Sequence, residues 1–388
     1  MKTKYLSFIL LIGTFFSCSE KEMSPISNSL GKPGVVTDVV TKSSPGGALI
    51  SYKIPDTEDL LAVKGVYVLS TGKQCEVIAS YYENKLNIQG YNDMEEHTVT
   101  LYAVNRAGEK SDPVMVSFTP EESPLNKAAK TASIEPDFGG ARFLWKNSEK
   151  APLNIELLGP DSEGKVSTLN ILTSNIENNT YSVRGFTSDL ATFSMVISDN
   201  FGNYSDTISA ELIPLFEEKL NKKKMRIMHL DSDADFSMYG CNEANLLDDD
   251  PETYVHTANN VMPAAFTVDL GTTAKLSRFV IHPRNIFNYY AHGNPKKMEV
   301  YTCDHTPNPN GDWSEWTKIM DCEVVKPSGL PGQTVTDLDL ETAKKGFEFS
   351  FDLEQPPMRY VRVLITSAWD ATSYTSPAEV TFYGEIVE

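Results

Sequence analysis

The sequence predicts an all-β protein built from three β-sandwich domains. Residues 31–120 and 121–215 consist of short alternating polar and apolar stretches separated by turn-forming residues, which is the pattern of half-buried strands. These two regions also repeat each other in sequence. Residues 226–388 again hold short strand-like stretches, but with different landmarks. A chain of 388 residues is too long for one hydrophobic core, which agrees with several domains.

The repeat is visible in two short motifs. Gly46-Gly47-Ala48 recurs as Gly139-Gly140-Ala141, and the stretch 105–112 recurs as 199–206. The two matches stand in the same order and at nearly the same spacing, which indicates a tandem pair of one fold. Trp145 lies in a strand-like stretch of the second copy and is expected in its core.

Residues 103–111 (Ala-Val-Asn-Arg-Ala-Gly-Glu-Lys-Ser) resemble part of a fibronectin type III domain. The resemblance implies a fibronectin type III-like sandwich over residues 31–122 and a second immunoglobulin-like sandwich over residues 123–218. His97 stands where that family has its tyrosine corner, so either its ring makes the equivalent bridge or the corner is absent. The basic stretch 215–225 is expected to be a solvated linker or a short helix.

The third domain carries landmarks of another family. Asp269-Leu270-Gly271, Arg359-Tyr360-Val361-Arg362 and the closing stretch 379–384 together resemble the discoidin (factor 5/8 type C) domain and family 32 carbohydrate-binding modules. The resemblance implies a discoidin-like jelly-roll β-sandwich over residues 226–388, with its loops gathered at one rim.

The acidic stretch 245–254 places the oxygen-bearing side chains of Asp248, Asp250 and Thr253 on one short loop. Hard cations such as Ca²⁺ need several oxygen ligands, and an acidic surface turn is the alternative interpretation. In the family that the third domain resembles, a structural calcium joins such a loop to the C-terminal strand. Carried over by spacing, its ligands here are Asn245, Asp248, Asp250, Thr253, Ala378 and Glu379.

The same resemblance implies a sugar site on the rim. Sugar faces stack on aromatic rings, while guanidinium and amide groups bind hydroxyls. The residues expected at the rim are Trp369, Arg284, Asn294, His256 and Tyr374. A structural ion pair is the alternative role for Arg284, and Trp313 and Trp316 are expected in the core.

The N-terminus predicts a targeting segment. Lys2 and Lys4 precede a short apolar run that is too short to span a membrane. The run ends at Phe15-Phe16-Ser17-Cys18, which resembles a lipobox, so residues 1–18 are expected to be a lipoprotein signal peptide with lipid on Cys18. An ordinary cleaved signal is the alternative. Residues 19–30 are expected to be a flexible tether, and 19–22 resemble the export tag of Bacteroidota surface lipoproteins.

Charge and motifs narrow the function classes. The net charge of −19 disfavours nucleic acid and anionic membrane surfaces, so membrane attachment is expected through the lipid anchor alone. The sequence has no nucleophile elbow, HExxH motif or glycine-rich phosphate loop, and no enzyme activity is expected. The thiols Cys75, Cys241, Cys303 and Cys322 form no CxxC motif; Cys303 and Cys322 either pair across strands or all four are isolated.

Together these features resemble accessory lipoproteins of polysaccharide-utilisation systems. The resemblance implies a non-catalytic protein, anchored by lipid in the outer membrane and facing the cell surface, that captures a polysaccharide for an importer. The inner, periplasmic face is the alternative location. The alternative functions are a protein-interaction scaffold of an uptake complex without sugar binding, and a glycosidase with an unrecognised site.

Overall fold

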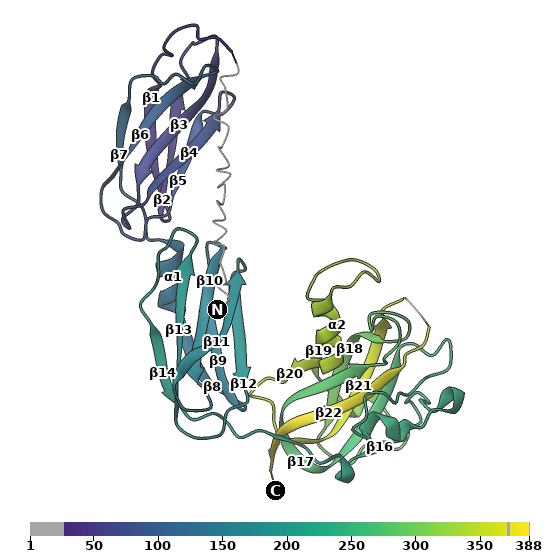
Figure 1. Cartoon of the computed structure of the whole chain (residues 1–388). Helices are drawn as coiled ribbons and strands as arrows, with labels where there is room; N and C mark the ends of the chain where they lie inside the picture. The colour runs from purple at the N-terminus through teal and green to yellow at the C-terminus, as the bar shows by residue number, and fades with distance from the viewer. Residues whose placement is uncertain (1–26, 371–372, 388) are drawn as a thin grey trace, which may run out of the picture.

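The computed structural model shows a β protein with three sandwich domains, two stacked end to end and the third set to one side (Figure 1). It describes residues 27–370 and 373–387. The fold class expected from the sequence is confirmed. The predicted signal peptide, the lipidated Cys18 and most of the tether lie outside the described residues.

The first domain packs a three-stranded sheet, in the order β1-β2-β5, on a four-stranded sheet, in the order β4-β3-β6-β7. Its strands pair antiparallel. They are β1 (Thr37–Ser44), β2 (Gly47–Lys53), β3 (Leu60–Val68), β4 (Gln74–Ser80), β5 (Lys85–Gln89), β6 (His97–Asn105) and β7 (Val114–Phe118). His97 binds the Asp93 carboxylate at 2.6 Å and stacks on Tyr91, so it bridges side chains and makes no tyrosine corner to the backbone.

The second domain repeats this topology strand for strand, with sheets β12-β9-β8 and β11-β10-β13-β14. A short helix, α1 (Pro124–Thr131), leads into it from the first domain, and Ser123 caps that helix by accepting from the Asn126 backbone at 3.0 Å. The strands are β8 (Ser133–Asp137), β9 (Gly140–Lys146), β10 (Leu153–Pro160), β11 (Val166–Ser174), β12 (Asn178–Arg184), β13 (Ala191–Asp199) and β14 (Ile208–Leu212).

The recurring Gly-Gly pair has the same structural cause in both domains. Gly46 and Gly139 have φ values of 65° and 63°, in the left-handed region that favours glycine. At Gly47 and Gly140, an added Cβ would lie 1.8 Å and 1.9 Å from the carbonyl oxygen of the neighbouring strand. The motif is therefore present in both domains because each backbone turns in the same way and passes equally close to the neighbouring strand.

Alternation along the strands builds the two cores. β2 and β9 share one burial pattern, in which every second side chain points between the sheets. Trp145, on β9, is 4% exposed and packs in the core of the second domain, as expected from the sequence. Full burial of one such large apolar side chain contributes about 1.5–3 kcal/mol.

The third domain is a larger sandwich organised by one bent strand of 20 residues, β17. Its first part, Ala264–Asp269, pairs with β16 and β21, and its last part, Ala274–Pro283, pairs with β20 and β22. One strand thereby takes part in both layers. The elements are β15 (Glu218–Lys219), β16 (Arg226–Met228), β17 (Ala264–Pro283), β18 (Pro295–Cys303), β19 (Thr317–Glu323), α2 (Asp337–Lys345), β20 (Phe347–Ser350), β21 (Met358–Ala368) and β22 (Pro377–Ile386).

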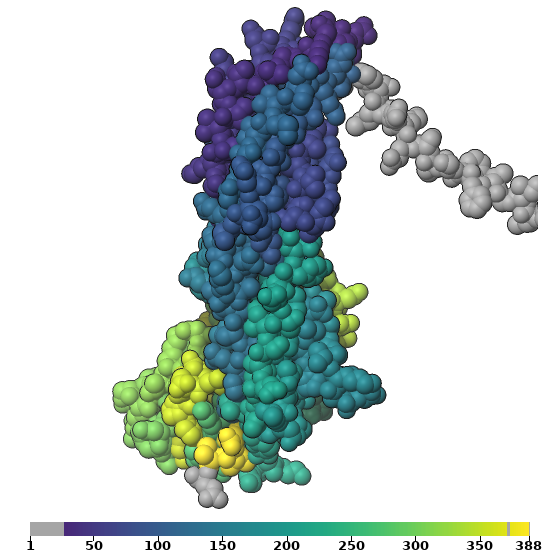
Figure 2. Space-filling model, turned by 90° about the vertical axis from the view of Figure 1, so that its left-hand side faces the viewer, coloured from purple at the N-terminus to yellow at the C-terminus, as the bar shows by residue number. Residues whose placement is uncertain are grey.

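The first two domains form a continuous rod (Figure 2). At their junction Phe201 packs directly against Gly90, and Asn203 donates to the Gly90 carbonyl at 3.0 Å. Asn126 of α1 donates to the Asn92 carbonyl at 3.0 Å. Packing and hydrogen bonds therefore connect the loops of the first sandwich to the loops and the helix of the second.

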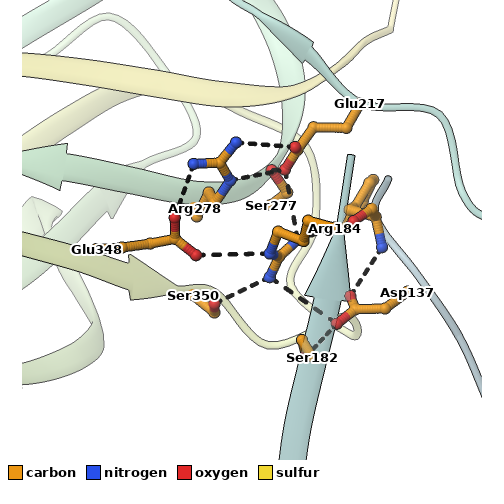
Figure 3. A network of polar contacts seen from close by, with 9 residues as sticks. Asp137, Ser182, Arg184, Glu217, Ser277, Arg278, Glu348 and Ser350 are labelled. Atoms are coloured by element: carbon orange, nitrogen blue, oxygen red, sulfur yellow. Dashed lines mark hydrogen bonds and ion pairs between the residues drawn. The ribbon is translucent and has the colours of Figure 1, made fainter. Parts of the chain in front are cut away.

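A network of charges joins the second domain to the third (Figure 3). Glu217, which follows β14, accepts two hydrogen bonds from Arg278 on β17, at 3.1 and 3.0 Å. Arg184 at the end of β12 lies 3.4 Å from the same carboxylate and donates to Ser350 at 3.0 Å. Arg278 also donates to Glu348 at 2.8 Å. Because Glu217 and both arginines are largely buried, the network fixes how the two domains meet.

Two expectations about single elements are settled by the fold. The stretch 215–225 forms β15 and a 3₁₀ turn, Lys222–Lys224, and Lys222 is buried instead of solvated. The four described cysteines are free; Cys322 pairs in register with Met298, so the suggested pairing with Cys303 is wrong. No helix in the described part of the chain is long and apolar enough to cross a membrane.

Replacing Glu217 with alanine should loosen the junction. Arg184 and Arg278 would lose their shared, largely buried carboxylate, at a cost of about 2–3 kcal/mol. We expect a lower melting temperature in calorimetry and a broader distance distribution in small-angle X-ray scattering. Glu163→Ala, which removes the exposed ion pair with Lys165, is the matched control and should change neither. An unchanged scattering profile for Glu217→Ala would contradict a fixed junction.

Candidate functional site

Three loops meet at the end of the third domain that points away from the second domain (Figure 1). This end is called the rim here, and its loops are residues 237–261, residues 284–294, and residues 369–370 with 373–376. Backbone hydrogen bonds join them: Thr257 to Thr375 at 3.1 Å, Ser376 to Gly293 at 2.8 Å and Trp369 to Asn294 at 3.2 Å. The rim is therefore a tied surface, and the five residues predicted to bind sugar all lie on it or just beneath it.

Asn294 cannot contact a ligand, which corrects the prediction made from the sequence. It is 0% exposed. Its side-chain oxygen accepts from the Arg284 backbone at 2.8 Å, and its amide nitrogen donates to the carbonyls of Arg284 and Tyr289 at 3.1 and 2.8 Å. Asn294 is a structural residue that closes the 284–294 loop.

Trp369 is partly buried in the wall beneath the rim. Its ring packs edge-on against Tyr290 at 5.0 Å between centroids. The ammonium groups of Lys296 and Lys326 lie 4.8 and 5.5 Å from its ring centroid. The predicted role of Trp369 as a stacking platform would therefore place a sugar beside these two lysines.

Arginines of the third domain stack on aromatic rings in one recurring way, with the guanidinium carbon 3.7 Å from the ring centroid. The pairs are Arg278 on Tyr383, Arg284 on Tyr254 and Arg362 on Trp313.

What distinguishes Arg284 from the other two is its free donors. Arg278 and Arg362 donate to the carboxylates of Glu217 and Asp233. Within residues 27–370 and 373–387, the Arg284 guanidinium has no hydrogen-bond or ion-pair partner, so the alternative role in an ion pair is not what the structure shows. It presents a rigid fork of N–H donors at the rim, suited to hydroxyl or carboxylate oxygens.

His256 and Tyr374 lie together, as the sequence suggested for rim residues. Their rings stack at 4.6 Å between centroids, and Tyr239 packs on His256 edge-on at 4.9 Å. His256 Nδ1 lies 2.6 Å from the Thr257 carbonyl, which requires the proton on Nδ1 in the neutral ring. Nε2 is then the hydrogen-bond acceptor of this aromatic cluster.

Two exposed aromatic residues of the rim were not expected from the sequence. Tyr239 is 71% exposed and Phe287 is 79% exposed, and Phe287 stacks on His292 at 4.7 Å. Tyr239, Phe287 and His292 all have positive φ values, between 51° and 60°, which are uncommon outside glycine and cost free energy. Strained backbone that holds apolar rings in solvent is typical of binding loops.

The acidic loop lies directly beneath Arg284. Asn245 donates from its side chain to the carbonyl of Tyr254 at 3.0 Å, and so positions the ring on which Arg284 stacks. Glu252 of the same loop accepts from Asn285 at 2.9 Å. The geometry of the acidic loop therefore determines where the guanidinium stands.

Three of the residues predicted to bind calcium, Asp248, Thr253 and Glu379, lie close together. Thr253 donates to the Asp248 carboxylate at 2.9 Å. Glu379 is 2% exposed, and its Oε2 atom is buried without a hydrogen-bond partner among the described residues. Burial raises the pKa of Glu379 to about 7, with Lys222 lowering it and Asp248 raising it. Two carboxyls that face each other this closely, one with an unpartnered oxygen, favour a shared cation.

Comparisons with known proteins place the chain in a family. Models for three families, each described as a domain of unknown function, match the chain in order: DUF4959 over residues 33–120, DUF5126 over 121–223 and DUF5000 over 234–384. A solved structure, the SusE-like protein BT2857, is 30% identical to this chain; the match covers 67% of this chain and 98% of that one, with a TM-score of 0.44. This chain belongs to the SusE-like family.

Other solved structures are similar to this SusE-like chain at lower identity. The C-terminal domain of a chitobiase from Bacteroides fragilis is 15% identical, over 44% of this chain and 100% of that one, with a TM-score of 0.32. CpGH89CBM32-5 from Clostridium perfringens, solved with GalNAc-β-1,3-galactose, is 15% identical, over 42% of this chain and 99% of that one, with a TM-score of 0.30. A search of curated proteins gave no significant match.

Lys222 is the residue of the SusE-like chain that sequence reasoning missed beside the predicted cation site. It comes from the stretch between the second and third domains, and its side chain is 3% exposed. Its ammonium group binds Glu379 Oε1 and lies 3.1 Å from the Asp249 carboxylate. The chain thus brings one positive charge of its own to the acidic loop. The run Lys222-Lys223-Lys224 gives no sign of which lysine turns inward.

Lys222→Met should destabilise the third domain by about 3 kcal/mol when measured in chelator, because Glu379 would remain buried without its ammonium partner. Adding Glu379→Gln should recover part of that loss, so that the double variant is more stable than the sum of the single effects predicts. Denaturant unfolding of the four proteins measures this coupling. The neighbouring Lys223→Met, at an exposed position, is the control and should be near neutral. Strict additivity would show that the Lys222–Glu379 contact contributes nothing.

Proposed function

We propose that this protein is a non-catalytic, lipid-anchored cell-surface protein that binds carbohydrate and captures glycans for an outer-membrane importer. Membership of the SusE-like family supports the class of function. The observation that carries the proposal for the rim is Arg284, whose donors have no partner among the described residues and whose guanidinium is stacked on Tyr254.

The rim supplies the two kinds of contact that sugar binding needs. Exposed rings at Tyr239 and Phe287 offer apolar surfaces for stacking against the C–H faces of a sugar. Arg284 offers directional donors, and His256 Nε2 offers an acceptor, to the hydroxyl groups. We place the ligand across the three rim loops, with Phe287, His292 and Tyr239 joining Arg284, His256 and Tyr374.

Binding at such an open surface is expected to be weak for one site. A millimolar dissociation constant corresponds to only about 4 kcal/mol. Many lipid-anchored copies on one polymer would raise the effective affinity without new contacts, since each further engagement is intramolecular. Capture of a long polysaccharide suits this regime better than retention of a single small sugar.

The rim is tested by binding to a panel of plant, microbial and host polysaccharides, followed by substitution. We expect Arg284→Ala and Phe287→Ala each to weaken binding of the retained polysaccharide at least tenfold, through lost hydrogen bonds and lost stacking. Affinity electrophoresis and calorimetry measure the change.

Arg106→Ala, an exposed arginine of the first domain, is the matched control and should bind like the unaltered protein. If the panel gave no binding, or if binding ignored both rim variants, the sugar proposal would fail. Retention of a transporter or enzyme with no glycan present would instead favour the scaffold alternative.

We further propose that Ca²⁺ binds at Asn245, Asp248, Asp250, Thr253, Ala378 and Glu379 and fastens the acidic loop to β22. The support is the unpartnered buried oxygen of Glu379 beside Asp248. The ion would do no chemistry. It would neutralise the facing carboxylates and hold Tyr254, and through it Arg284, in position.

Chelation should lower the melting temperature of the third domain. With calcium at 100 times its dissociation constant the bound ion contributes about 2.7 kcal/mol, which corresponds to roughly 5–10 °C for a domain of this size. Calorimetry with EDTA and with added CaCl₂ measures the shift. Asp248→Asn should melt at the same temperature in both conditions. Equal melting of the unaltered protein with and without calcium would rule out the proposed site.

A further inference from the structure

A second cluster of metal-binding side chains lies at the far end of β18 from the rim. Cys303, Asp304 and His305 follow one another where β18 ends, and their possible ligand atoms all lie within 4.8 Å of one another. β18 starts at Pro295, beside the rim, and its nine residues separate the two ends by roughly 26 Å. The cluster is therefore independent of both the rim and the acidic loop.

The distance between sulfur and imidazole in the cluster is close to that of a tetrahedral metal site. His305 Nδ1 lies 3.6 Å from Cys303 Sγ and 2.7 Å from Asp304 Oδ1. A zinc ion with ordinary Zn–S and Zn–N bonds holds its sulfur and nitrogen ligands about 3.5 Å apart. The sulfur and the imidazole already stand at that separation, and the exposed Asp304 carboxylate needs only a small shift to complete three ligands.

A further carboxylate faces the other nitrogen of His305. Glu315 Oε2 lies 3.9 Å from His305 Nε2, and it accepts the Asn308 backbone N–H at 2.9 Å. Glu315 stands on a 3₁₀ turn, Trp313–Glu315, which Asp312 caps by accepting from Ser314 at 2.9 Å. Histidines that bind metals usually donate their second nitrogen to such a carboxylate, which fixes the tautomer and the ring orientation.

The electrostatics of the cluster also favour a divalent cation. The carboxylates of Asp304 and Glu315 lie 2.7 and 3.9 Å from the two ring nitrogens of His305, and their negative charges attract a dication. The Cys303 side chain is buried, but those of Asp304 and His305 are exposed, so an ion can reach the sulfur from solvent.

We propose that Cys303, Asp304 and His305 form a zinc site, with Glu315 as an outer partner of His305 and the fourth coordination position open to water. A thiolate with an imidazole selects zinc over calcium and magnesium, which take oxygen ligands. On binding, the S–H bond of Cys303 is replaced by an S–Zn bond, and the proton passes to solvent. The ion would tie the end of β18 to the 304–315 loop and protect a free thiol from oxidation.

Cobalt(II) reports on this site directly, because a cobalt–thiolate bond gives a charge-transfer absorption in the near ultraviolet that oxygen and nitrogen ligands do not give. The purified protein, kept reduced, is titrated with CoCl₂ and then with ZnCl₂. We expect a saturable band of one equivalent that zinc abolishes. Cys303→Ser should lose the band, His305→Ala should bind at least tenfold more weakly, and Glu315→Gln about tenfold more weakly.

The matched control is Cys322→Ala, which removes a buried thiol of the same domain outside the cluster and should keep the band in full. His305 is exposed, so His305→Ala tests the site without disturbing the core, and circular dichroism confirms folding. Absence of a near-ultraviolet band in the unaltered protein at millimolar cobalt would overturn the proposal. A band that persists in Cys303→Ser would overturn it as well, since another thiol would then be the ligand.

Discussion

The buried contact between Lys222 and Glu379 is the interaction on which the arrangement of the acidic loop and the rim of the third domain depends. Lys222 comes from the segment between two domains, and Glu379 stands near the start of the C-terminal strand β22. Asp248 and Asp249 of the acidic loop approach the same two groups. One cluster of charges thereby joins a linker, a loop and a strand that are distant in the sequence. Above it, Tyr254 supports the free guanidinium of Arg284.

The three stacked arginines of the third domain differ in whether their donors are engaged by a carboxylate. Arg278 and Arg362 stack on rings as Arg284 does, but their donors are taken up by Glu217 and Asp233. Arg278 in this way joins the domain to the rod, while Arg362 fastens the strand β21 to the chain near residue 233. Since stacking is common to all three, what distinguishes Arg284 is that its guanidinium has no carboxylate partner among the described residues.

The parts of the fold that could be predicted from the sequence are those in which neighbouring residues decide the outcome. The alternation of polar and apolar residues predicted the strands. The two Gly-Gly pairs indicated the repeat, because the local backbone geometry requires glycine at those positions. Trp145 was assigned to the core by the same periodicity. Arg284 could be placed at a strand end from the sequence, because it directly follows the recognisable strand β17.

The roles of Asn294, Trp369 and Lys222 could not be predicted, because each depends on partners distant in the sequence or on loop conformation. Nothing in the residues around Asn294 shows that three backbone groups will saturate its amide. The lysines that cover Trp369 include Lys326, more than forty positions away. The exposure of Tyr239 and Phe287 at the rim could not be predicted from the sequence either, since left-handed backbone at a non-glycine residue is visible only in the structure.

The glycine pairs have a consequence for substitution in the first two sandwiches. At Gly47 and Gly140 any side chain would meet the backbone of the neighbouring strand, so a larger residue fits only if that strand moves. A change at an exposed surface position of either domain requires no such movement. The two pairs therefore mark positions at which the repeated backbone itself, and not side-chain packing, restricts the sequence.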